Sequence, residues 1–161
     1  MLRALALSSL LGAFVAPAAS LAADPLWAAD LTDAAHPITV YRTASCGCCK
    51  GWVSHLRDHR FLVYEVVLDD LRSVRQRLGV APELASCHTA VADGHVFEGH
   101  VPANDIKAVI EGHDEIRLLA VPAMPSGTPG MDFPGARKDD FTVVAEDRDG
   151  TRRAFRTYAG Y

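Results

Sequence analysis

Three of the four cysteines in this chain lie in one tetrapeptide, Cys46-Gly47-Cys48-Cys49. Cys46 and Cys49 have the C-x-x-C spacing of thioredoxin-like redox sites, in which one thiolate attacks a disulfide and the other resolves it. Cys48 adds a third sulfur, which a two-thiol redox cycle does not require. Thiolates at this density suit a soft metal ion better than they suit simple disulfide exchange.

The thiols and a metal ion would stabilise one another at this position. Three thiols that ionise together repel one another, and a bound cation removes that repulsion and displaces their protons. Soft thiolates select Cu(I), zinc or iron–sulfur clusters. Zinc requires tetrahedral ligands, which the adjacent Cys48 and Cys49 cannot easily supply together with the other cysteines. Cu(I) accepts fewer thiolates and can share bridging ones, so we expect copper, with several ions as an option.

The tetrapeptide lies between a predicted strand and a predicted helix. Residues 38–41 form a β-branched and aromatic run after Pro37, which is typical of a strand. The next apolar residues recur at i, i+3, i+4 and i+7, the core-facing stripe of a helix: Cys49, Trp52, Val53 and Leu56. This pattern predicts that Cys49 faces the core while Cys46, before the helix, is more exposed.

The remaining segments predict the order β-α-β-α-β-β-α through residue 111, which is the order of the thioredoxin fold. Residues 61–68 are almost continuously apolar, as in a buried strand, and residues 71–78 fit a helix. Asp93-Gly94 predicts a hairpin turn, and Pro102 opens another helix. We expect an α/β, thioredoxin-like fold with an added C-terminal loop and β-hairpin.

Cys87 lies where the third strand of this fold should begin. In the thioredoxin architecture that segment lies against the redox loop, so the four sulfurs are expected to converge. A two-residue turn at Asp93-Gly94 would place Cys87 opposite His100, in a register that could slip by one residue. His100 is therefore a candidate auxiliary ligand. Side chains alternate between the two faces of a strand, so His88 should point away from the face that carries Cys87. His88 is therefore a weaker candidate ligand unless the strand is twisted or bulged there.

The beginning of the chain has the organisation of a secretory signal peptide. Arg3 provides a short basic start, residues 5–15 are apolar, and small residues follow Pro17. We expect export with cleavage near Ala22 or Ala23. An uncleaved membrane anchor is the alternative, since the uncharged stretch is almost long enough to span a bilayer.

The chain is long enough for one domain with a hydrophobic core, and its charge balance is mildly acidic. The chain has 16 basic and 20 acidic side chains, and the leader holds one of the basic ones, Arg3, so the formal charge of the mature chain becomes −5. No basic stripe is evident, which argues against nucleic acid as a partner. We expect a signal peptide at 1–23, an N-terminal lead-in at 24–36 and a single metal-binding domain at 37–161.

Export makes structural disulfides an alternative use of the cysteines. A Cys48–Cys49 bridge would be strained and a Cys46–Cys48 bridge would close a tight ring, so metal binding is favoured over a disulfide-stapled interaction module. A Cys46–Cys49 disulfide is compatible with the metal-free protein. A thiol–disulfide oxidoreductase that uses these two cysteines is the second hypothesis.

Several ordered motifs resemble one known family, the CopG-type periplasmic copper-resistance proteins, across roughly residues 38–158. The motifs that carry this resemblance are Cys46-Gly47-Cys48-Cys49-Lys50 with Trp52, Ser86-Cys87-His88-Thr89, Glu98-Gly99-His100-Val101-Pro102, and Val121-Pro122-Ala123-Met124-Pro125 leading to Ser126-Gly127-Thr128-Pro129-Gly130-Met131. The resemblance implies a thioredoxin-like fold and copper handling in the periplasm, alongside other copper-handling proteins. It implies that Cu(I) is bound by Cys46, Cys48, Cys49 and Cys87, in a site that could be multinuclear and redox-active. It does not decide whether the protein is an enzyme.

Met124 and Met131 lie on either side of a Gly/Pro-rich loop. Thioether sulfur is a ligand for Cu(I), but methionine more often fills gaps in a core, so packing is the favoured role for both. The loop, residues 122–135, either specifies turns or covers the cysteine site. The other histidines are expected at the surface: His36, His55, His59, His95 and His113.

Overall fold

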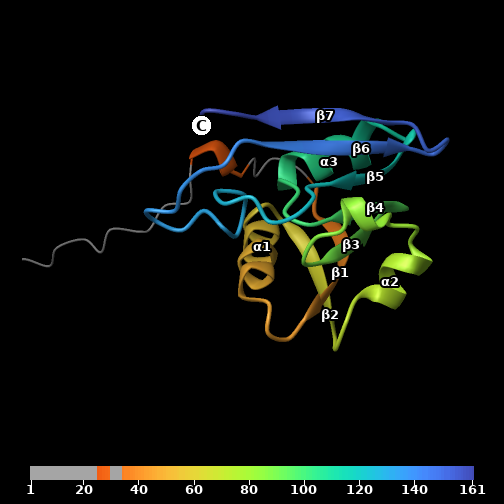
Figure 1. The fold of residues 1–161 in the computed structure, drawn as a ribbon, viewed down its shortest axis with the longest axis horizontal. Coiled ribbons are helices and arrows are strands. Elements are labelled where there is room, and N and C mark those ends of the chain that lie inside the picture. Colours follow the sequence, from red (N-terminus) through yellow and green to blue (C-terminus); the bar gives the residue numbers. More distant parts are fainter. Residues whose placement is uncertain (1–24, 30–33) are drawn as a thin grey trace, which may run out of the picture.

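The computed structural model describes residues 25–29 and 34–161, so the predicted signal peptide lies outside the described residues. The described chain forms one seven-stranded sheet with helices packed against it (Figure 1). Among these residues, no helix has the length and apolar character needed to cross a membrane. The elements in chain order are η1 (Pro25–Trp27), β1 (His36–Thr43), α1 (Gly47–Asp58), β2 (Phe61–Leu68), α2 (Arg72–Arg77), η2 (Pro82–Leu84), β3 (Thr89–Ala92), β4 (His95–Glu98), α3 (Ala103–Gly112), β5 (Ile116–Ala120), β6 (Phe141–Asp147) and β7 (Arg152–Tyr158).

The strands lie in the order β2-β1-β3-β4-β5-β6-β7. β1 is parallel to β2 and β4 is parallel to β5, while the other neighbours are antiparallel. The first four strands and α1, α2 and α3 follow the predicted β-α-β-α-β-β-α order, which confirms the expected α/β, thioredoxin-like fold. The predicted C-terminal hairpin, β6 with β7, extends the same sheet from β5.

β3 and β4 form the hairpin that Asp93-Gly94 predicts. Asp93 has φ 48° and Gly94 has φ 78°, and this two-residue turn needs positive φ at both positions. Val91 pairs with Val96, as expected. The register from the sequence is therefore confirmed, and it brings the residues before β3 next to those after β4.

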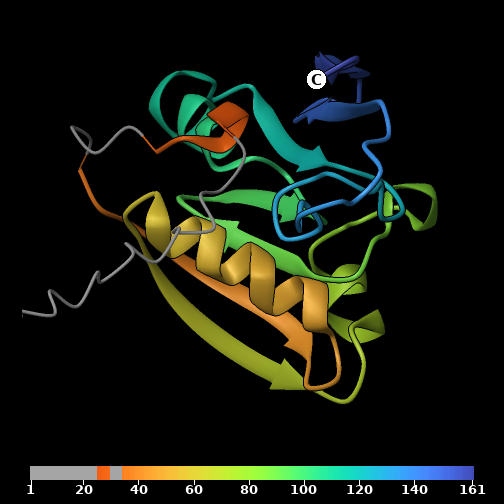
Figure 2. The same cartoon turned by 90° about the vertical axis from the view of Figure 1, so that its left-hand side faces the viewer.

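α1 begins directly after Cys46 and presents an apolar stripe to the sheet. Cys46 is the N-cap residue, and its Sγ accepts a hydrogen bond from the N–H of Cys49 at 3.3 Å. Figure 2 shows α1 lying along the face of β1 and β2. The four buried positions of the helix are the predicted ones: Cys49, Trp52, Val53 and Leu56. Cys46 is half-buried, so the predicted difference between the two cysteines is confirmed.

β2 differs from its predicted environment. Its bounds match the apolar run at 61–68, but β2 is an edge strand and only one of its faces is packed. Leu62 and Tyr64 are 53% and 60% exposed, and Val67 is half exposed. A continuous apolar run was the wrong indicator of burial here, because nothing in the local pattern distinguishes an edge strand from a central one.

An aromatic cluster joins the two ends of the described chain. Trp27 is buried against Phe141, Tyr158 and Tyr161. The rings of Phe141 and Tyr158 stack with centroids 4.8 Å apart. These contacts hold η1 against the C-terminal hairpin, so η1 packs on the domain.

Candidate metal centre

The four cysteine sulfurs meet at the beginning of α1. Cys46 comes from the N-cap position before the helix, Cys48 and Cys49 from its first turn, and Cys87 from the segment that leads into β3. All four Sγ atoms lie within 4.8 Å of one another. Cys48 Sγ lies 3.5 Å from Cys46 Sγ and 4.0 Å from Cys87 Sγ. The convergence expected from the sequence is therefore found, and the adjacent Cys48 and Cys49 both reach the cluster.

Two of these cysteines are oxidised and two are free. Cys46 and Cys49 form a disulfide, whereas Cys48 and Cys87 remain thiols. The pairing is the one expected for a metal-free C-x-x-C site. A thiolate is the form that binds metal, so the disulfide must be reduced before all four sulfurs can act as ligands. The two free thiols are also not what a fully disulfide-stapled module would contain.

His100 presents a ring nitrogen to the cluster. Its Nδ1 lies 2.8 Å from the carbonyl oxygen of Pro129. A carbonyl only accepts hydrogen bonds, so Nδ1 carries the proton of the neutral ring. Burial lowers the pKa of His100, which favours that neutral ring. Nε2, 3.1 Å from Cys87 Sγ, is then left with a lone pair that can accept from a thiol or bind a metal.

His88 lies at the same site, contrary to the strand alternation expected for it. β3 begins only at Thr89, so His88 precedes the ladder and does not follow its alternation. Its Nδ1 lies 3.2 Å from Cys87 Sγ, and its ring packs on that of Trp52 with centroids 4.2 Å apart. His88 is fully buried, and burial lowers its pKa well below the ordinary value. A neutral ring nitrogen is therefore within reach of the cluster from a second side.

The thiol of Cys87 is protonated in this state. Burial, and then the neighbouring Cys48, raise the pKa of Cys87 to about 12. The apolar surroundings disfavour a thiolate, and so does a second sulfur 4.0 Å away. A cation bound among the sulfurs would reverse this preference, because it compensates the charge that burial penalises.

Glu98 holds the segment that carries Cys87, and sequence reasoning gave it no role. Its carboxylate is fully buried and accepts hydrogen bonds from the backbone N–H of Ser86 at 2.7 Å and from Thr89 Oγ1 at 2.5 Å. Arg75 Nε donates to the same carboxylate at 2.9 Å, and another nitrogen of that guanidinium donates to the carbonyl of Ser86. Burial raises the pKa of Glu98 even with these partners. The sequence contained one indication of this role, since Glu98 is a single acidic residue at the end of an apolar strand.

The loop at 122–135 covers the start of α1, as one interpretation of the sequence expected. Gly130 has φ 83°, and a Cβ there would lie 2.4 Å from the backbone nitrogen of Trp52 and 2.8 Å from the carbonyl oxygen of Cys48. Only glycine permits so close an approach of two backbones. Pro129, one residue earlier, supplies the carbonyl that orients His100. The loop therefore helps to build the site as well as covering it.

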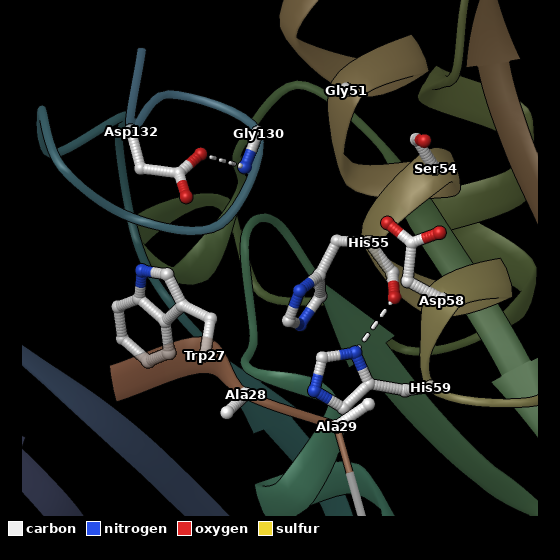
Figure 3. A pocket seen from close by; sticks show the side chains of 10 residues that line it. All are labelled: Trp27, Ala28, Ala29, Gly51, Ser54, His55, Asp58, His59, Gly130 and Asp132. Atoms are coloured by element: carbon white, nitrogen blue, oxygen red, sulfur yellow. Dashed lines mark hydrogen bonds between the residues drawn. The ribbon is translucent and has the colours of Figure 1, made fainter. Parts of the chain in front are cut away.

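A pocket lies next to this contact, between α1 and η1 (Figure 3). Its volume is about 360 Å³, and His55 and Trp27 are among its walls. Nε2 of His55 accepts a hydrogen bond from the N–H of Ala103 at 3.0 Å. Burial, followed by the neighbouring His59 and His100, lowers the pKa of His55 to about 3. The neutral ring then carries its proton on Nδ1 and offers no second lone pair, so we assign no metal to this pocket.

Of the five histidines expected at the surface, two are instead buried and the other three are half-buried. His59 and His95 are each 2% exposed. Nδ1 of His59 donates to the carbonyl of His55 at 2.8 Å, and Nδ1 of His95 donates to that of Ile116 at 2.7 Å. Each buried ring thus satisfies a nearby backbone carbonyl. Polarity alone did not predict this burial, because a histidine can be buried where its ring bonds a backbone carbonyl.

The fold and the site together define a class: a thioredoxin-like α/β protein with a sulfur-rich centre of the kind that suits soft metals. A family model described as "Protein of unknown function, DUF411" matches residues 84–131. No curated protein gives a significant match.

Two solved structures resemble the chain over most of its length. They are described as "Copper resistance protein copG", Form 1 and Form 2, at 43% and 42% sequence identity, each with a TM-score of 0.73. The similarity covers 78% of this chain and 98% and 99% of those chains. The chain therefore belongs to the CopG family of copper resistance proteins.

Proposed function

We propose that this protein is an exported Cu(I)-binding protein of copper resistance. Its metal ligands are Cys46, Cys48, Cys49 and Cys87, with His100 as an auxiliary ligand. The observation that carries the proposal is the meeting of four cysteine sulfurs within 4.8 Å of one another in a member of a copper-resistance family. Several Cu(I) ions could share such thiolates as bridges, which makes a multinuclear, redox-active site compatible with the proposal.

The choice of copper over zinc rests on the family and on the surroundings of the sulfurs. The sequence indicated that the adjacent Cys48 and Cys49 could not easily both bind one tetrahedral zinc ion. Both sulfurs reach the cluster, so this steric argument against zinc is weaker than expected. Two neutral imidazoles, His88 and His100, also lie at Cys87. Six soft or borderline donors exceed the four of a closed structural zinc site, and bridged Cu(I) ions use such a surplus.

The place of action that we propose is the periplasm. The basic start, apolar run and small-residue end of residues 1–23 form the signal peptide, which is removed on export. Residues 24–36 lead into a single metal-binding domain at 37–161, and no membrane anchor is retained. Copper ions are the cargo, and other periplasmic copper-handling proteins are the expected donors or acceptors. Nucleic acid is not an expected partner.

Metal analysis with thiol counting on protein purified without oxygen tests the proposal directly. We expect stoichiometric copper on the reduced protein and little zinc. Cys87→Ser should sharply reduce the copper content, because it removes the one cysteine ligand that lies far from α1 in the sequence. His113→Gln, at the end of α3, should not. If Cys87→Ser retains the wild-type stoichiometry and affinity, the four-sulfur site is wrong.

A thiol–disulfide oxidoreductase is the second candidate, and the Cys46–Cys49 disulfide favours it. Cys46, the more exposed of the pair, would be the attacking thiolate, and Cys49 the resolving one. This function predicts metal-independent turnover with a protein disulfide or with glutathione. Tight copper binding without such turnover would exclude it.

A further inference from the structure

A small pocket opens beside the cysteine cluster, on the side of Cys87. Its volume is about 270 Å³, and it is lined by Ala85, Ser86, Cys87, Ala123 and Met124. One wall is the segment that leads into β3, and the other is the chain just after β5. The pocket thus brings together two sulfur-bearing side chains that are far apart in sequence.

Met124 does not serve the core. Its side chain is 52% exposed, whereas a gap-filling methionine is enclosed by apolar neighbours. Met131, the other methionine of this loop, is half-buried and does not line the pocket, and its backbone N–H donates to Thr128 while its carbonyl accepts from Gly127. The packing role expected for both methionines therefore does not fit Met124.

The backbone next to Met124 is held in a strained conformation. Ala123 has φ 60°, in the left-handed region that costs a residue with a Cβ about 1 kcal/mol or more. Its carbonyl accepts a hydrogen bond from Ser86 Oγ across the pocket. Ser86 is itself fixed by Glu98 and Arg75. Both walls are therefore held in place, and the thioether is presented at the rim of the pocket rather than on a free loop.

The thioether of Met124 and the thiol of Cys87 differ in how they bind Cu(I) and in how they respond to oxidation. It binds Cu(I) without losing a proton, whereas Cys87 must release one. A thioether also forms no disulfide, so it stays available while the cysteines are oxidised.

From these observations we infer that Met124 and Cys87 form a transit site through which Cu(I) enters the cysteine cluster, a role that rests on the proposed function. Cu(I) first binds the Met124 thioether at the rim. It then forms a bond to the Cys87 sulfur, whose proton passes to water, and the bond to the thioether breaks. Copper stays Cu(I) throughout, so no electron acceptor or donor is needed.

The test compares the rates at which the reduced protein takes Cu(I) from its bicinchoninate complex, followed by loss of the absorbance of that complex in a stopped-flow instrument. Met124→Leu keeps the volume of the side chain and removes only the sulfur. We expect it to slow uptake by about tenfold and to reach the wild-type copper content at the end. Met131→Leu, the matched control on the same loop, should take up copper at the wild-type rate.

The outcomes separate this inference from the proposed function. If the wild-type protein takes no Cu(I), the proposed function fails and the transit site with it. If the wild type binds Cu(I) and Met124→Leu does so equally fast, only the transit site is wrong. A lower final copper content in Met124→Leu would also overturn it, because Met124 would then be a resident ligand. Equal slowing by Met131→Leu would overturn it as well, since the effect would belong to the loop as a whole.

Discussion

Nε2 of His100 lies 3.1 Å from Sγ of Cys87, across the open end of the β3–β4 hairpin. The opposite ring nitrogen donates to the carbonyl of Pro129 at 2.8 Å. This arrangement is typical of a metal-binding imidazole, whose second nitrogen is fixed by a backbone or carboxylate acceptor. The hairpin brings the two side chains together, and the loop at 122–135 decides which nitrogen faces the sulfur.

Replacement of His100 should weaken copper binding without abolishing it. His100→Gln removes the lone pair beside Cys87, and we expect a loss of about tenfold to a hundredfold in Cu(I) affinity. Competition with a Cu(I) chelator of known affinity measures this. His95→Gln is the matched control, since that ring is equally buried but donates to Ile116 away from the cluster. Equal losses in both variants would mean that His100 acts only through stability.

Glu98 should matter for both the stability of the fold and the copper site. Glu98→Leu leaves the N–H of Ser86, the hydroxyl of Thr89 and part of Arg75 without their acceptor, and each such buried donor costs about 1–3 kcal/mol. We expect a lower free energy of unfolding in urea and weaker copper binding, because Cys87 directly follows Ser86. Glu98→Gln retains an acceptor oxygen and should lose less in both measurements. If Glu98→Leu unfolds at the wild-type urea concentration, the anchoring role is wrong.

Two glycines with almost the same backbone conformation provide a comparison for the covering loop. Gly130 has φ 83° and Gly135 has φ 82°, but a Cβ on Gly130 would meet Trp52 at 2.4 Å while one on Gly135 would have no atom within 4 Å. Gly135→Ala should therefore cost only the backbone strain, about 1 kcal/mol.

Gly130→Ala should cost clearly more than Gly135→Ala in urea unfolding, because the loop must also move away from α1. It should further weaken copper binding, since Pro129 would move with the loop and release His100. Similar unfolding free energies for the two variants would show that the approach of the loop to α1 contributes little.

The thiol of Cys87 should react slowly with alkylating reagents in the oxidised, metal-free protein. Burial and then Cys48 raise its pKa to about 12, so at pH 8 the thiolate fraction is far below that of an ordinary cysteine. The rate of reaction with iodoacetamide, followed by mass spectrometry, should rise steadily with pH and show no plateau below pH 10.

Cys48→Ser should speed this reaction, because it removes the neighbouring sulfur, which is one of the causes of the raised pKa. Burial, the larger cause, stays in place, so the rate should not reach that of a free thiol. A plateau near pH 8 in the unchanged protein would contradict the assigned environment of Cys87.

Local patterns in the sequence were sufficient for much of the fold. The i, i+3, i+4, i+7 stripe placed Cys49 and Trp52 in the core because a helix repeats its faces over short distances. Asp93-Gly94 specified the hairpin register because few residues tolerate positive φ at both positions of the turn. Local patterns do not show whether a strand lies at the edge of a sheet, so only the structure revealed that one face of β2 is exposed.

The sequence by itself determined the donor set: four cysteines, three of them at the start of one helix, with a fourth expected to meet them. Only the tertiary structure decided what surrounds these sulfurs. It turned the ring of His88 toward the sulfur of Cys87 and placed Glu98 next to Ser86. It also laid Gly130 against α1 and set Met124 at the rim of a pocket. The physical reason is that periodicity and turn chemistry report on neighbours in the chain, whereas ligands, buried partners and covering loops come together only when distant segments pack.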